Sequence, residues 1–255
     1  RHLDKLMDGF GDLNTLVYDP EILDGLTHVV RNLIVSKIAG SLKKFWIGVI
    51  SVTLSTALAS ITWPLSILGL TAMISNPYSL AVDRAEKCGR LLAKVLYEDH
   101  VQGHRPVTLV GSSLGARAIF YCCEELARHN QKGIVENVFL IGAPVSTDPS
   151  EEDRWLSVRS VVAGRLVNAY SKNDWVLATI YRVMNLSFNV AGLFPLEYSS
   201  LNSENGLIEN VDLSGLVESH FDYTKADRMQ HILAQLQIPR SVPVTTATTT
   251  VEELH

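Results

Sequence analysis

Apolar residues after position 82 follow two patterns that alternate along the chain. Short segments dominated by apolar residues, typical of buried strands, occupy residues 107–110, 135–141 and 165–169, and the segment 208–211 (Ile-Glu-Asn-Val) is predicted to be a further strand. Apolar residues recur every three or four positions, which is typical of amphipathic helices, over residues 83–98, 115–129 and 224–236. A helix between two strands favours parallel pairing, because it carries the chain back to the start of the next strand. The pattern therefore predicts an α/β fold, with a mostly parallel sheet and helices on both faces.

A long apolar segment precedes this alternating region. No Asp, Glu, Lys, Arg or His occurs from Phe45 to Val82, Pro64 divides the segment, and we expect residues 76–77 (Asn-Pro) to break it. The part before Pro64 would be about 28 Å long as a helix, close to the roughly 30 Å of a bilayer core. Two interpretations stay open on these residues alone. One is a membrane-inserted helix or broken hairpin, and the other is a buried helical pair or a lid over an apolar pocket.

The length of 255 residues suits one large domain with its own core. We expect this single domain to cover residues 1–240, with the apolar helical insertion at about 45–75. Residues 241–255 are rich in Thr and Val, lack either periodicity and are predicted to be a disordered tail. The first strand-like segment is 14–18, and the chain opens at Arg1 without a Met or a signal-peptide pattern. We therefore expect a piece of a longer protein, with N-terminal strands of the sheet preceding it.

The composition narrows the classes of function. There are 22 Lys and Arg against 27 Asp and Glu, a net charge of −5, so no nucleic-acid partner is expected. Cys88, Cys122 and Cys123 have the spacing of neither a disulfide framework nor a zinc site, which favours packing roles and a reducing compartment. The sequence has no phosphate-binding loop, no dinucleotide-binding glycine pattern and no histidine or carboxylate cluster at metal-ligand spacing. We expect neither a cofactor nor a metal.

Residues 111–115, Gly-Ser-Ser-Leu-Gly, match the pattern G-x-S-x-G with Ser113 at its centre. They lie between a predicted strand and a predicted helix, which is the context of a nucleophile elbow. We expect a cramped backbone at Ser113 and collisions for any side chain at position 111 or 115. At the helix N-terminus, the backbone N–H of Leu114 would be an oxyanion donor. The alternative is a serine-rich helix cap without chemistry.

A serine nucleophile needs a base and an acid, which in nucleophile-elbow folds follow in the order Ser, Asp or Glu, His, each after a later strand. Two aspartates are candidates for the acid. Asp174 follows the predicted strand 165–169, whereas Asp148 follows 135–141 and precedes Pro149, which is typical of an ordinary turn. Asp174 is preferred, because the acid usually comes after the second strand beyond the elbow.

Beyond Asp174 the chain has three histidines, His220, His231 and the terminal His255. His220 follows the predicted strand 208–211 by a short loop, whereas His231 lies inside the predicted helix 224–236. We therefore predict a catalytic triad of Ser113, Asp174 and His220.

Four long segments contain specific motifs: residues 105–117 (RPVTLVGSSLGAR), 135–144 (VENVFLIGAP), 160–171 (SVVAGRLVNAYS) with Asn173-Asp174, and 208–217 (IENVDLSGLV) before His220. They resemble the transmembrane and coiled-coil domain-containing protein 4 family, and the resemblance runs over about residues 16–236. That eukaryotic family is described as having an α/β-hydrolase fold with hydrophobic membrane segments. The resemblance implies an α/β-hydrolase, matches Ser113, Asp174 and His220 to triad positions, and favours the membrane interpretation of residues 45–74.

These expectations combine into a membrane-associated serine hydrolase, esterase- or lipase-like, that cleaves an acyl ester or thioester of a membrane lipid or other acyl substrate. The second oxyanion donor of such folds comes from a loop after an early strand, which we expect to precede Arg1. The alternative is a catalytically silent α/β-hydrolase-fold module for membrane interaction or trafficking, with a trafficking protein as partner. An intracellular membrane location is expected in both cases.

Overall fold

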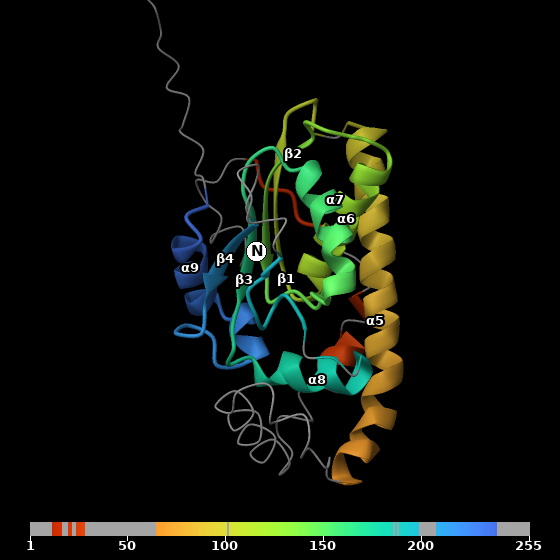
Figure 1. Cartoon of the computed structure of the whole chain (residues 1–255), viewed down its shortest axis with the longest axis vertical. Helices are drawn as coiled ribbons and strands as arrows, with labels where there is room; N and C mark the ends of the chain where they lie inside the picture. Colours follow the sequence, from red (N-terminus) through yellow and green to blue (C-terminus); the bar gives the residue numbers. More distant parts are fainter. Residues whose placement is uncertain are drawn as a thin grey trace, which may run out of the picture.

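The structure, a computed structural model, describes residues 12–16, 20–21, 24–28, 65–100, 102–185, 187, 189–198 and 208–238. Within these residues one sheet contains the strands β1 (Val107–Ser112), β2 (Val135–Ile141), β3 (Leu166–Tyr170) and β4 (Ile208–Asp212). The strands lie in the order β1-β2-β3-β4, and every neighbouring pair is parallel (Figure 1). The predicted α/β class is confirmed, and each strand lies within two residues of its predicted limits.

The parallel register brings the carboxyl ends of the strands to one edge of the sheet. Ser112 pairs with Ile141, Ile141 pairs with Ala169, and Tyr170 pairs with Asp212. The connections that follow β1, β2, β3 and β4 therefore all begin at this carboxyl edge, where open α/β sheets bind ligands.

Helices cover both faces of the sheet, which explains why residues 138–141 of β2 are all apolar and buried. Val138 and Leu140 of β2 pack into a core with α6 (Leu114–Arg128) and α7 (Glu152–Ser160). Phe139 and Ile141, which alternate with them, pack into a second core with α9 (Ala226–Gln235). Figure 1 shows α9 on one side of the sheet and α6 and α7 on the other.

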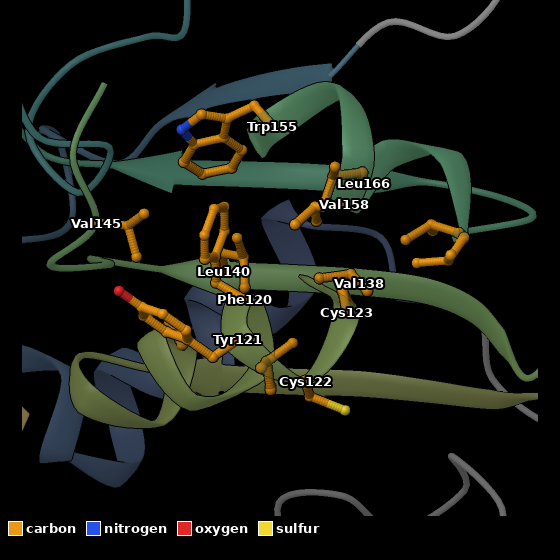
Figure 2. Close-up of a cluster of buried hydrophobic side chains, with 14 of the residues drawn as sticks. Phe120, Tyr121, Cys122, Cys123, Val138, Leu140, Val145, Trp155, Val158 and Leu166 are labelled. Carbon is orange, nitrogen blue, oxygen red and sulfur yellow. The ribbon is translucent and has the colours of Figure 1, made fainter. Parts of the chain in front are cut away.

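Aromatic rings form the centre of the core between the sheet and α6. Phe120 and Trp155 are fully buried and meet edge-to-face, with ring centroids 4.7 Å apart (Figure 2). The indole N–H of Trp155 donates to the Ser146 carbonyl oxygen at 2.9 Å, which ties α7 to the segment after β2. Cys122 and Cys123 belong to the same core, as their predicted packing role requires. Burial raises the pKa of the Cys123 thiol to about 12, so it stays protonated.

The helix α5 (Leu65–Tyr97) differs most from the prediction. The sequence predicted a helix over 83–98 and a break at residues 76–77, but the helix runs through Pro77, and the predicted break was wrong. Proline in a helix interior removes one backbone hydrogen bond and costs about 3 kcal/mol. Packing of the following turns against α6 offsets this cost, because Ala81 and Ala85 are fully buried there with Leu114 and Ala118.

Several predicted features lie wholly or partly outside the described residues. Residues 45–64 of the apolar insertion and the tail 241–255 are outside them, and residues 65–74 form the N-terminal part of α5. Of the strand-like segment 14–18, residues 14–16 are described and are not in a strand. Among the helices described, none has both the length and the apolar character that crossing a bilayer requires.

Candidate active site

Ser113 lies between the end of β1 and the start of α6, at the carboxyl edge of the sheet. Its backbone has φ 53° and ψ −125°, a conformation that residues other than glycine rarely adopt, so the cramped backbone expected there is present. The Ser113 N–H donates to the Ile141 carbonyl oxygen at 2.8 Å, which holds the turn against β2. The Ser113 hydroxyl therefore lies at the tip of this sharp turn.

The two glycines of the motif differ in their surroundings. A Cβ at Gly111 would lie 2.7 Å from the Ile119 Cδ1 atom and 2.8 Å from the Ala116 backbone nitrogen, so the collision predicted at position 111 is confirmed. A Cβ at Gly115 would meet no atom within 4 Å, so the collision predicted there was wrong. A side chain at position 115 would extend into open space and not toward the sheet.

His220 reaches Ser113 from a distant part of the chain. It begins the short 3-10 helix η3 (His220–Thr224), which follows β4. Its Nε2 lies 2.6 Å from the Ser113 Oγ, and its Nδ1 lies 2.7 Å from the Asp174 Oδ2. With the Nδ1–H donating to the carboxylate, Nε2 can accept the hydroxyl proton of Ser113. The His220 side chain is 21% exposed, so it is shielded from water on most sides.

Asp174 immediately precedes α8 (Trp175–Asn185) and caps its first turn. Its Oδ1 accepts the backbone N–H of Leu177 at 3.0 Å, while Oδ2 faces His220. The side chain is fully buried. A buried carboxylate is tolerated here because both oxygens have partners and a helix N-terminus favours negative charge.

Asp148 and His231, the other candidates for the acid and the base, have different contacts. Asp148, just before η1 (Pro149–Glu151), accepts hydrogen bonds from the Ser146 hydroxyl at 2.9 Å and from the Asn189 amide at 2.6 Å. His231 is exposed on α9, with Nδ1 2.7 Å from the Asp227 carbonyl oxygen. The structure thus brings Asp174 and His220, and not these two residues, to Ser113.

Asp222 holds the loop that carries His220. Its Oδ2 accepts the backbone N–H groups of Glu218 and Ser219 at 2.9 and 3.0 Å, and its Oδ1 lies 2.7 Å from the Lys225 Nζ. Burial acts to raise the pKa of the Asp222 carboxyl, but Lys225 and the two amides outweigh it, so the pKa lies below its ordinary value. The sequence analysis missed this residue, although Ser219 followed three positions later by an acid is a capping-box signal.

The backbone N–H of Leu114 opens α6 directly after Ser113. The first amides of a helix have no intrahelical acceptor and carry the positive end of the helix dipole, which suits an oxyanion. The donor role of Leu114 stays a prediction, as does the second donor. Within the described part of the chain, no three His, Cys, Asp or Glu side chains are grouped so that they could hold a metal ion.

Residues 1–239 match the model of a family described as "Protein of unknown function (DUF726)". The chain belongs to the DUF726 family. A rice relative (Oryza sativa subsp. japonica), "Transmembrane and coiled-coil domain-containing protein STS1", is 38% identical over 230 residues, which are 90% of this chain and 32% of the rice protein. An "Uncharacterized membrane protein" of Schizosaccharomyces pombe is 41% identical over 214 residues, 84% of this chain and 35% of that protein.

A further relative of this DUF726 chain, "Probable lipase MIL1" of Saccharomyces cerevisiae, is 36% identical over 218 residues, 85% of this chain and 19% of the yeast protein. The DUF726 chain therefore spans about a fifth to a third of the length of these curated relatives. No solved structure matches it. The names of the rice and fission yeast relatives describe membrane proteins, in agreement with the membrane location predicted from the sequence.

Proposed function

We propose that this DUF726 chain is the catalytic part of a membrane-associated serine hydrolase that cleaves an acyl ester or thioester. The observation that carries the proposal is the continuous path from the Ser113 hydroxyl through the His220 imidazole to the Asp174 carboxylate, with separations of 2.6 and 2.7 Å. Both distances are those of short hydrogen bonds, and the bond to the Asp174 carboxylate is charge-assisted. The relative named a probable lipase supports the same chemistry.

In the first half of the proposed reaction, the Ser113 Oγ bonds to the acyl carbonyl carbon while its proton passes to the His220 Nε2. The carbonyl electron pair moves onto oxygen, and the Leu114 N–H donates to the resulting oxyanion. Asp174 keeps the Nδ1–H directed toward itself and stabilises the imidazolium. When the oxyanion collapses, the bond to the alcohol or thiol breaks, and His220 gives its proton to that leaving group.

In the second half, water attacks the carbonyl carbon of the acyl-serine, and His220 takes a proton from that water as the bond forms. Collapse of the second oxyanion breaks the bond between the acyl carbon and the Ser113 Oγ. His220 then returns its proton to Ser113, and a carboxylic acid leaves. The site ends in its starting protonation state.

The α/β-hydrolase fold is part of the proposal. Ser113, Asp174 and His220 follow β1, β3 and β4, which is the order in which that fold presents its nucleophile, acid and base. The positive φ of Ser113 suits the elbow of that fold. The resemblance to the transmembrane and coiled-coil domain-containing protein 4 family supports the same fold.

A lipid-like substrate is proposed from the position of an uncharged helix end. Residues 65–76 of α5 contain no charged side chain, and Figure 1 shows that this end of α5 extends past α8, beyond the carboxyl edge of the sheet. A helix of 33 residues is about 50 Å long, roughly two to three times the length of the strands. The apolar end can therefore reach a bilayer while the rest of α5 packs against α6, which would bring Ser113 close to lipid acyl groups.

The alternative, a silent module for membrane interaction or trafficking, predicts a base too remote to accept the serine proton. The 2.6 Å between the Ser113 Oγ and the His220 Nε2 favours the hydrolase instead, since it is direct hydrogen-bond contact without a bridging water.

Labelling of the full-length protein in isolated membranes with a fluorophosphonate probe tests the proposal. We expect the wild type to react and Ser113→Ala to lose the label, because the probe phosphorus bonds only to an activated hydroxyl. Ser112→Ala is the matched control, because Ser112 is a β1 residue paired with Ile141, and it should keep the label. Unchanged labelling of Ser113→Ala would refute the assignment.

A further inference from the structure

Tyr223 lies three positions after His220 in η3, and only 4% of its surface is exposed. Its ring stands at 89° to the His220 imidazole, with ring centroids 5.3 Å apart. Edge-to-face contacts of this kind fix the relative orientation of two rings, and an aromatic face also attracts a positively charged ring. The imidazole is therefore held at Nδ1 by Asp174 and against its ring by Tyr223.

Gly142, the residue after β2, leaves the space that the Tyr223 ring fills. A Cβ at Gly142 would lie 2.5 Å from the Tyr223 Cε2 and 2.8 Å from its hydroxyl oxygen, and the φ of Gly142 is +57°. The Gly142 N–H donates to the Ala169 carbonyl oxygen at 2.8 Å, which extends the pairing of β2 with β3. The ring thus rests against backbone that continues the hydrogen bonding of the sheet.

The Tyr223 hydroxyl does not hold the ring in place. It has no hydrogen-bond partner among the residues that the structure describes. Burial, followed by the nearby charges of Asp174 and Asp222, raises the pKa of this phenol well above its ordinary value, so it stays neutral. The Tyr223 ring therefore adds no charge of its own near Asp174.

We propose that Tyr223 is a positioning residue for His220: its ring, wedged between Gly142 and the imidazole, keeps Nε2 directed at Ser113 and shields the His220–Asp174 pair from water. This inference rests on the proposed hydrolase function, because only a catalytic base requires such an orientation. Misplacing a catalytic group by about 1 Å can lower a rate roughly 100-fold.

The test compares three variants of the full-length protein by the second-order rate constant of fluorophosphonate labelling, corrected for the folded fraction. Tyr223→Phe keeps the ring and should label close to the wild-type rate. Tyr223→Leu removes the ring and should label about 10- to 100-fold more slowly.

Ile232→Ala is the control, because Ile232 is fully buried in the same core on α9. This variant should lose stability and keep its labelling rate. Tyr223→Met, which keeps most of the volume without an aromatic face, replaces Tyr223→Leu if that variant does not fold.

Wild-type labelling by Tyr223→Leu would overturn the positioning role and leave the proposed hydrolase intact. Equal losses in Tyr223→Leu and Ile232→Ala would also overturn it, because core packing alone would explain them. A Tyr223→Phe variant as slow as Tyr223→Leu would shift the role from the ring to the hydroxyl and contradict the inference. A wild-type protein that does not label would refute the hydrolase and this inference together.

Discussion

The two oxygens of the Asp174 carboxylate have different partners. Oδ1 caps α8 at the N–H of Leu177, while Oδ2 holds the Nδ1 of His220. The residue that starts α8 therefore also orients the imidazole, so the acid cannot shift without loosening the first turn of a helix. A side-chain cap contributes about 1 kcal/mol. A substitution that keeps the cap therefore separates the structural role of Asp174 from its proposed catalytic role.

Asp174→Asn is such a substitution. Its amide oxygen can still cap α8, but its NH2 group would face Nδ1 and force the proton of the imidazole onto Nε2, which then cannot accept from Ser113. We expect the fluorophosphonate labelling rate to fall about 10⁴-fold with little change in melting temperature. Asp148→Asn is the control, because the Asp148 carboxylate bonds to Ser146 and Asn189, and it should label normally. Loss of labelling in Asp148→Asn alone would identify Asp148 as the acid.

At the scale of elements, the contact between α5 and α6 depends on small residues. Ala81, Ala85, Gly89 and Ala93 recur every four positions and are buried, so they form one face of α5. A Cβ at Gly89 would lie 2.1 Å from the Ala118 carbonyl oxygen. The two helices therefore approach until backbone meets backbone, which sets the position of α6 and, at its N-terminus, of Ser113.

Gly89→Ala tests this close approach. On an exposed helix surface the change from Gly to Ala stabilises a protein by up to about 1 kcal/mol. At Gly89 we expect the opposite sign, a loss of about 1–3 kcal/mol, because α5 must move away from α6. Gly115→Ala is the matched control, since a Cβ at Gly115 meets nothing within 4 Å. The free energy of unfolding from urea titration measures both, and equal stability of the two variants would contradict the account of this interface.

At the scale of the whole molecule, the parallel sheet explains how distant residues meet. Ser113 and His220 are 107 positions apart, and Asp174 and His220 are 46 apart. Each follows a strand whose carboxyl end lies at the same edge, so the register of the sheet brings the three loops together. The uncharged end of α5 extends beyond that same edge (Figure 1), which relates the proposed chemistry to a membrane surface.

The proposed membrane attachment predicts a result for alkaline carbonate extraction. We expect the full-length protein to stay with the membrane pellet, and a variant with Leu54→Asp and Leu68→Asp to move largely to the supernatant. Each Asp at the centre of a membrane helix costs roughly 2.5–3.5 kcal/mol, so both halves of the apolar segment would be affected. Leu80→Asp with Leu91→Asp is the control, because both residues are exposed on α5, and it should stay in the pellet. Release of the wild-type protein by carbonate would favour a lid over a membrane-inserted segment.

Features that depend on neighbours in the sequence were predictable from it. The pattern of apolar residues predicted the four strands of the described sheet within two residues of their limits, and it is clearest in β2, where residues 138–141 are all apolar and buried. The G-x-S-x-G motif predicted the cramped backbone at Ser113, where φ is 53°, because this motif is typical of a sharp turn between a strand and a helix. The order of aspartates and histidines after later strands reduced the partners of Ser113 to a few candidates.

Features that depend on contacts across the fold were decided only by the tertiary structure. Local rules placed a break at Pro77, but burial of the following turns of α5 against α6 outweighs the lost hydrogen bond. The same rules placed a collision at Gly115, where there is open space. No local pattern marks Tyr223, because its contact with His220 depends on room left by Gly142, a residue of another strand connection. A sequence encodes the periodicity of its own elements, whereas the distance between two side chains on different loops is set by how those elements pack.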